Sequence, residues 1–98
     1  MKYRVITLDA AFADLKEIKK YLTQFYPHTA TRFVNTYLQH TARLKNMPYA
    51  FEIFADDRDY RRMAVGDYLV FYMVDEQAKR VEIHRVLHGS RDIEQLLS

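Results

Sequence analysis

The pattern of apolar and polar positions divides the N-terminal half of the chain into a strand followed by two helices. Residues 2–8 alternate apolar and polar side chains and include β-branched residues, which predicts a strand. From Ala11 to Phe25 the apolar residues recur every three or four positions, which is typical of an amphipathic helix, and Asp9 is expected to cap its start. Pro27 interrupts this helix.

A second apolar stripe follows Pro27 and includes Phe33, Val34, Tyr37 and Leu38, which predicts another helix. This helix is expected to end near residues 46–48, where an asparagine is followed by a proline. Two amphipathic helices joined by so short a turn predict an αα-hairpin.

The C-terminal half returns to a strand-like pattern. Residues 60–65, 67–75 and 80–88 are predicted strands, and the segments between them are short enough to be hairpin turns. They should therefore form a three-stranded antiparallel meander. Residues 90–97 are predicted to form a short C-terminal helix capped by Ser90.

These elements predict an α+β fold in the order β-α-α-β-β-β-α, with residues 1–98 forming one domain. The first strand has no neighbour in sequence with which to pair, so it is expected to join the sheet from a distance, as an edge strand. The helical hairpin should cover one face of the sheet and leave the other partly open, and that second face is where a functional site is expected.

Strict alternation along the last strand sorts its side chains between the two faces of the sheet. The set expected under the helices is Val81, Ile83, Arg85 and Leu87, and the set expected on the open face is Glu82, His84, Val86 and His88. Arg85 sits awkwardly in an apolar set, so it should lie at an edge or pair with a carboxylate.

The side chains that could carry chemistry are basic. A metal-independent site for RNA cleavage needs a base, an acid and cations to hold the phosphate. The candidates for these roles are Arg61, Arg62, His84, His88 and Arg91. The same residues could instead be a contact surface for a macromolecule, or merely the solvated residues of an antiparallel sheet. Tyr60, Tyr68 and Tyr72 could stack on bases, but core positions are the simpler interpretation.

Composition narrows the function classes further. The chain has no cysteine, a net charge of +2 and a sequence pI near 8.9, which falls short of the dense basic stripe of a dedicated nucleic-acid-binding protein. No cofactor or metal is expected, since nucleotide-binding and metal-ligand motifs are missing, and His84 and His88 would lie about 13 Å apart along a strand. Without a secretion signal or a membrane span, the protein is expected to be soluble and cytoplasmic.

Three segments together resemble a known superfamily. They are TLDAAFADLKEIKKY (residues 7–21), YRRMAVGDYLVFYMVD (residues 60–75) and VEIHRVLHGSRD (residues 81–92). Their order and spacing are similar to those of the RelE/ParE superfamily, the toxins of bacterial type II toxin–antitoxin pairs, which include plasmid-stabilisation systems. The resemblance implies an antitoxin partner that wraps the toxin, with any association with DNA being indirect, through that antitoxin.

The resemblance also implies one of two activities. RelE-like toxins are ribosome-dependent endoribonucleases that cleave mRNA, but Leu69 and Gly89 stand here where their pattern places arginines, and no tyrosine lies near the C-terminus. The chain is therefore more similar to the ParE branch, whose members inhibit DNA gyrase by binding and bring no catalytic residues to carry over. The ribonuclease, an mRNA interferase that would act on the ribosome, remains the first alternative. A diverged interaction module without toxicity is the second.

Overall fold

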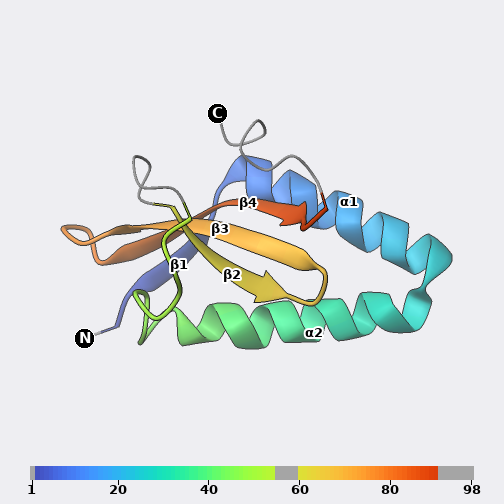
Figure 1. Cartoon of the computed structure of the whole chain (residues 1–98), viewed down its shortest axis with the longest axis horizontal. Coiled ribbons are helices and arrows are strands. Elements are labelled where there is room, and N and C mark those ends of the chain that lie inside the picture. Colours follow the sequence, from blue (N-terminus) through green and yellow to red (C-terminus); the bar gives the residue numbers. More distant parts are fainter. Residues whose placement is uncertain (1, 55–59, 91–98) are drawn as a thin grey trace.

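The computed structural model describes residues 2–54 and 60–90 (Figure 1). They form two helices and four strands, and the strands make up one sheet. In chain order the elements are β1 (Arg4–Thr7), α1 (Asp9–Phe25), α2 (Pro27–Arg43), β2 (Arg61–Val65), β3 (Tyr68–Asp75) and β4 (Arg80–His88). These elements confirm the predicted α+β order up to the last strand. The predicted C-terminal helix and Arg91 lie outside the described residues, apart from Ser90.

The four strands form one mixed sheet in the order β1-β4-β3-β2. Strands β2, β3 and β4 are consecutive antiparallel neighbours, which confirms the predicted meander. Strand β1 pairs in parallel with the first half of β4, from Arg4 opposite Arg80 to Thr7 opposite Ile83. The helical hairpin connects β1 to the rest of the sheet, which confirms that the first strand joins from a distance as an edge.

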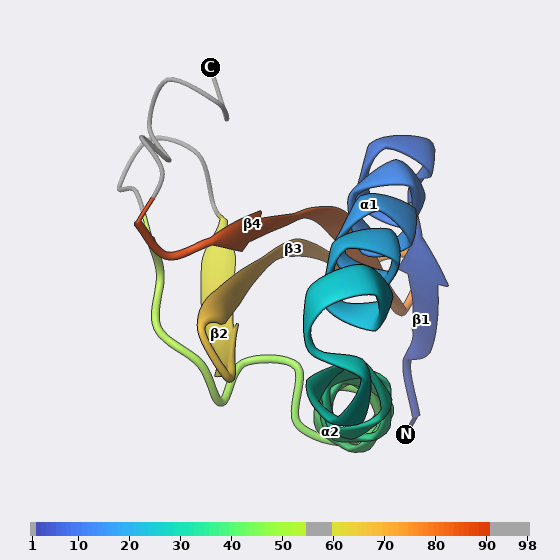
Figure 2. The ribbon, with the colours of Figure 1, turned by 90° about the vertical axis from the view of Figure 1, so that its right-hand side faces the viewer.

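The two helices lie side by side against one face of the sheet (Figure 2). Pro27 occupies the first turn of α2, where its missing N–H costs no hydrogen bond. The expectation that Asp9 caps α1 is wrong, because Leu8 is the N-cap residue and Asp9 is already the first residue of the helix. None of the described helices is long and apolar enough to cross a membrane.

The sheet buries side chains on both of its faces. The larger cluster lies between the sheet and the helices, with Phe33, Tyr37, Met63 and Tyr72 among its buried members. A second, smaller cluster lies on the face of the sheet opposite to the helices, here called the reverse face. Its buried members are Tyr60, Phe71 and Leu87, with Phe54, Leu69 and Met73 packed against them. The reverse face is therefore not a simple solvated surface: it has an apolar centre of its own.

A β-bulge in β4 changes which side chains face the helices. Phe71 pairs with Arg85 whereas Tyr72 pairs with Ile83, so His84 is an additional residue that has no paired residue on β3. Beyond the bulge the alternation is reversed. Val86 packs in the cluster under the helices, and Leu87 packs on the reverse face. The faces predicted for Val86, Leu87 and His88 are therefore wrong, because strict alternation assumes an uninterrupted strand.

Candidate functional site

His84, the bulge residue, lies on the reverse face of the sheet beside Tyr60 and Glu82. Its Nδ1 atom is 3.5 Å from the Tyr60 hydroxyl, and the two rings meet edge to face at 5.3 Å between centroids. Its Nε2 atom is 3.7 Å from a carboxylate oxygen of Glu82, yet it is buried and has no hydrogen-bond partner within the described part of the chain. A catalytic imidazole must offer a nitrogen to the reacting proton. Here, both nitrogens point to protein groups.

Arg62 shares the reverse face and is also occupied. Its Nε and Nη2 atoms each lie 2.7 Å from one carboxylate oxygen of Glu52, and its guanidinium stands over the Phe54 ring, 5.6 Å from the ring centre. Both charged groups remain well exposed, so the pair is solvated and contributes little to stability. The pair does matter for electrostatics, because the Glu52 carboxylate already balances the positive charge of Arg62.

Arg61 points to the opposite face of the strand. Its guanidinium donates hydrogen bonds to the backbone carbonyls of Phe51, at 2.7 Å, and of Tyr49, at 3.4 Å, and it stacks 5.0 Å from the Tyr49 ring centre. These contacts fasten the segment after α2 to the first strand of the meander. One nitrogen of the Arg61 guanidinium, Nη1, is therefore engaged by the backbone of this segment.

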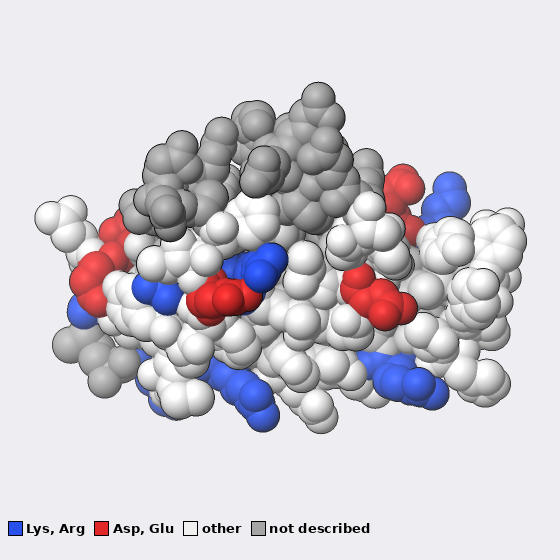
Figure 3. Space-filling view, viewed as in Figure 1, with Lys and Arg blue, Asp and Glu red and all other residues white. Residues whose placement is uncertain are grey.

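Basic side chains on the reverse face lie next to acidic ones around its apolar centre. Arg80 donates to both Asp75 and Glu82, so the charges along this part of the sheet are paired. Figure 3, which looks onto this face, shows red and blue groups next to each other within a mostly uncharged surface. Within residues 2–54 and 60–90, Arg62 and Arg80, which share this face, therefore each have a carboxylate partner.

His88 lies on the other side of the sheet, in the wall of a cavity. The bulge turns it toward the helices, where its ring meets the Tyr68 ring edge to face at 5.3 Å. Its Nδ1 atom lies 2.7 Å from the Ser90 hydroxyl and accepts the Ser90 backbone N–H. The cavity has a volume of about 620 Å³ and is bounded by the end of the helical hairpin, the turn between β2 and β3, and the end of β4.

Three aromatic side chains stand exposed at the tip of the hairpin beside this cavity. Tyr21, Phe25 and Tyr26 are 50%, 56% and 54% exposed, and Tyr21 is in ring contact with both of the others, at 5.1 Å and 6.2 Å between centroids. Tyr21 and Tyr26 also line the cavity. The prediction that Phe25 faces the core is wrong, as is that for Leu38, which is 58% exposed. These three residues, here called the aromatic tip, could have been noticed in the sequence as a cluster of aromatic residues just before Pro27. Apolar periodicity alone predicts a core position for Phe25.

The four predicted site residues that the structure describes thus do not come together. His84 and Arg62 share the reverse face, Arg61 lies at the far end of the helix-facing side, His88 lines the cavity, and Arg91 is outside the described residues. Tyr60 and Tyr72 are buried, as the simpler interpretation expected, and Tyr68 is half-buried in the cavity wall.

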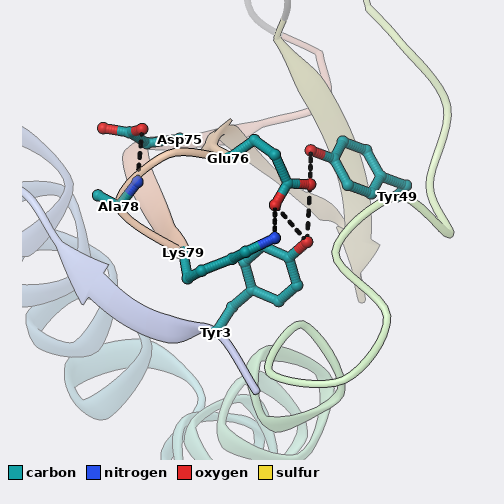
Figure 4. Close-up of polar contacts among 6 residues, drawn as sticks. All are labelled: Tyr3, Tyr49, Asp75, Glu76, Ala78 and Lys79. Carbon is teal, nitrogen blue, oxygen red and sulfur yellow. Dashed lines mark hydrogen bonds and ion pairs between the residues drawn. The ribbon is translucent and has the colours of Figure 1, made fainter. Parts of the chain in front are cut away.

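Sequence reasoning also missed a polar cluster at the turn between β3 and β4 (Figure 4). The Glu76 carboxylate accepts hydrogen bonds from the Tyr3 hydroxyl at 2.8 Å and the Tyr49 hydroxyl at 2.9 Å, and it pairs with Lys79. The Lys79 ammonium and the two hydroxyls lower the pKa of Glu76 to about 2. The cluster joins the N-terminal segment, the segment after α2 and this turn, so its role is to hold three parts of the chain together.

Comparison with known proteins identifies the family. The family described as the ParE toxin of the type II toxin–antitoxin system parDE matches residues 5–93. Among curated protein sequences, none matches this chain.

Solved structures give the same fold at low identity. A chain of the chromosomal ParDE toxin–antitoxin system from P. aeruginosa aligns with a TM-score of 0.74 and 15% identity, covering 89% of this chain and 96% of that one. The toxin–antitoxin complex RelBE2 from Mycobacterium tuberculosis gives 0.63 and 20% identity, over 90% and 99% of the two chains. The archaeal RelE–RelB complex from Pyrococcus horikoshii OT3 gives 0.64 and 22%, over 93% and 99%. The chain therefore belongs to the ParE toxin family, within the RelE/ParE superfamily of type II toxins.

Proposed function

We propose that this ParE-family toxin acts in the cytoplasm by binding DNA gyrase and blocking it, and that a cognate antitoxin neutralises it. The observation that carries the choice of gyrase over mRNA is the separation of the candidate catalytic groups. His84 and His88 lie on opposite faces of the sheet because of the bulge, and the two arginines of β2 are each held by other parts of the chain.

This separation counts against RNA cleavage for a geometric reason. A base, an acid and a cation must all reach one phosphodiester, within about 3 Å of its atoms. In this protein the Nε2 atom of His84 is buried, and Arg62 already faces the carboxylate of Glu52. An inhibitor that works by binding needs none of these groups to be free, so it fits the arrangement better.

The proposed antitoxin contact is the cavity together with the aromatic tip formed by Tyr21, Phe25 and Tyr26. Large exposed apolar patches on a small protein mark sites of protein association, and a cavity of about 620 Å³ beside them can receive apolar side chains of a partner. The solved relatives from Mycobacterium tuberculosis and Pyrococcus horikoshii are themselves complexes of a toxin with its antitoxin.

The target is tested with purified protein in two assays run side by side. We expect the protein to inhibit supercoiling by gyrase and to leave ribosome-bound mRNA intact. The variants His84→Ala, Arg62→Ala and His88→Ala should inhibit gyrase within about threefold of the unchanged protein, since His84 and Arg62 are engaged by Tyr60 and Glu52 and His88 lines the cavity proposed for the antitoxin. Cleaved transcripts that disappear with His84→Ala would establish the ribonuclease instead.

The antitoxin contact is tested by calorimetry with the antitoxin encoded next to this chain. Replacing Tyr21 and Tyr26 by serine should weaken binding at least tenfold, because the pair supplies exposed apolar surface at the cavity. Phe12→Ser is the matched control, since Phe12 is 56% exposed elsewhere on α1. Equal affinity in all three proteins would place the antitoxin on another surface.

A further inference from the structure

The charges of this chain are unevenly distributed along the sequence. Residues 18–51, which cover most of the helical hairpin and the segment after it, contain five Lys or Arg and no Asp or Glu. The rest of the chain holds ten basic and thirteen acidic residues. A net charge of only +2 therefore conceals a segment with a charge of +5, next to a remainder that is net acidic.

Helix α2 carries part of this charge in an ordered way. Its buried residues, Ala30, Phe33, Tyr37 and Thr41, define the side that faces the sheet. On a helix of 3.6 residues per turn, positions spaced by four, three, four and four residues form a stripe, and one such stripe runs along the side opposite to the buried one. Its members are His28, Arg32, Asn35, Gln39 and Arg43, all of them exposed.

The stripe spans almost the whole helix and is free to make contacts. From residue 28 to residue 43 it covers about 22 Å along the axis, at 1.5 Å per residue. None of the five side chains forms an ion pair or a hydrogen bond with another described residue. In Figure 3 the lower edge, along which α2 runs in Figure 1, shows blue groups and no red ones. Helix α2 itself contains no acidic side chain that could compete for the stripe.

We propose that the outer face of α2 docks directly in the major groove of duplex DNA. Arginine forms paired hydrogen bonds with the edge of guanine, and asparagine and glutamine form them with adenine, so Arg32, Asn35 and Gln39 have the side chains that read base edges. The major groove of B-form DNA is about 12 Å wide and admits one α-helix. Duplex RNA is excluded as the partner because its major groove is too deep and narrow for side chains to read.

This inference goes beyond the proposed inhibition of gyrase, and it differs from the expectation that DNA is reached only through the antitoxin. It concerns the outward side of one helix, whereas the proposed antitoxin contact is the cavity and the aromatic tip. Arg32 is the one stripe residue that also lines the cavity. The two surfaces therefore adjoin at Arg32.

The experiment measures binding of the purified full-length chain to a labelled DNA duplex of about 20 base pairs by fluorescence anisotropy, over a series of salt concentrations. Neither gyrase nor antitoxin is present, so the result does not depend on the proposed target. We expect Arg32→Gln/Arg43→Gln to weaken binding at low salt by at least tenfold. The slope of log affinity against log salt should fall by about one, since a lost phosphate contact removes about 0.9 and Arg43 is the member of the pair not assigned to a base edge.

Lys16→Gln/Lys20→Gln is the matched control, because it removes the same charge from exposed positions of α1. It should reduce affinity and slope clearly less, and circular dichroism should show both variants to be folded. Asn35→Ala/Gln39→Ala should reduce the preference between DNA sequences while leaving the salt slope unchanged. The proposal is overturned if the unchanged protein does not bind DNA at low salt, if both charge variants lose affinity equally, or if duplex RNA binds as tightly as duplex DNA.

Discussion

Asp14 of α1 holds Arg85 of β4 through two parallel hydrogen bonds, with N–O distances of 2.7 Å and 2.9 Å. The same carboxylate accepts the backbone N–H of Val86 at 2.9 Å. Strand β1 pairs with β4 only as far as Ile83, so beyond that residue no strand among residues 2–54 and 60–90 lies along this edge of β4. Asp14 therefore accepts a backbone N–H that a neighbouring strand would otherwise pair with. It also fixes α1 against the part of β4 that follows the bulge.

Replacing Asp14 by alanine should destabilise the fold by about 1–3 kcal/mol. The variant leaves the Arg85 guanidinium and the Val86 N–H without their partner in a partly buried position, and unpaired groups of this kind carry such a cost. Urea unfolding should show a lower midpoint with an unchanged slope. Glu17→Ala, an exposed change on the same helix, should stay within about 0.5 kcal/mol. Equal midpoints for the two variants would show that the Asp14 contacts contribute nothing.

Tyr72 is the second buried polar link, between the centre of the sheet and the segment after α2. Its side chain is fully buried and its hydroxyl donates to the Pro48 carbonyl at 2.8 Å, and burial raises its pKa to about 12. Tyr72→Phe should cost about 1–3 kcal/mol, since the carbonyl of the buried Pro48 loses its donor. Tyr21→Phe, at a half-exposed ring, is the control and should leave the unfolding midpoint unchanged. A stabilised Tyr72→Phe protein would contradict this assignment.

Periodicity predicted the helices and the longer strands of this fold because each of them has a long and regular apolar pattern. The αα-hairpin and the meander follow from such patterns, and the remote position of β1 follows from the lack of a sequence neighbour. The pairing of Arg85 with a carboxylate was one of the two expected outcomes, because a guanidinium among apolar residues needs a partner.

The bulge could not be predicted in the same way, and it decides the candidate site. One inserted residue, His84, changes the face of everything after it, while the sequence keeps a plausible alternation throughout. The two histidines were expected to share a face for this reason. The contacts of Arg61 and Arg62 could not be predicted either, because their partners lie in residues 49–54. This segment has no periodic pattern from which its position could be inferred.

Gly66 provides a test of backbone conformation at the turn between β2 and β3. Its φ of +60° is left-handed, and a Cβ atom placed there would meet nothing within 4 Å. Gly66→Ala should therefore cost about 1–2 kcal/mol through backbone strain alone. Gly66→Asn should cost less, since asparagine adopts this conformation more readily. Midpoints of urea unfolding provide the measurement, and equal losses in both variants would point to a cause other than the backbone.

The Glu76 cluster predicts a specific dependence of stability on pH. Hydrogen bonds from Lys79, Tyr3 and Tyr49 lower the pKa of Glu76 from 4.5 to about 2 in the folded protein. Because the folded value is the lower one, the unfolded chain binds the proton first as the pH falls. The stabilisation is therefore complete above the unfolded value and is lost between about pH 4.5 and pH 2.

Glu76→Gln should remove this dependence, because an amide does not titrate. The unfolding midpoint of the unchanged protein should exceed that of the variant at neutral pH, and the difference should shrink across the window from pH 4.5 to pH 2. Glu17→Gln, at an exposed glutamate of α1, should follow the unchanged protein at every pH. The cluster is solvent-exposed, so added salt should reduce the difference at neutral pH. A difference that stays constant down to pH 2 would mean that the charge of Glu76 does not stabilise this turn.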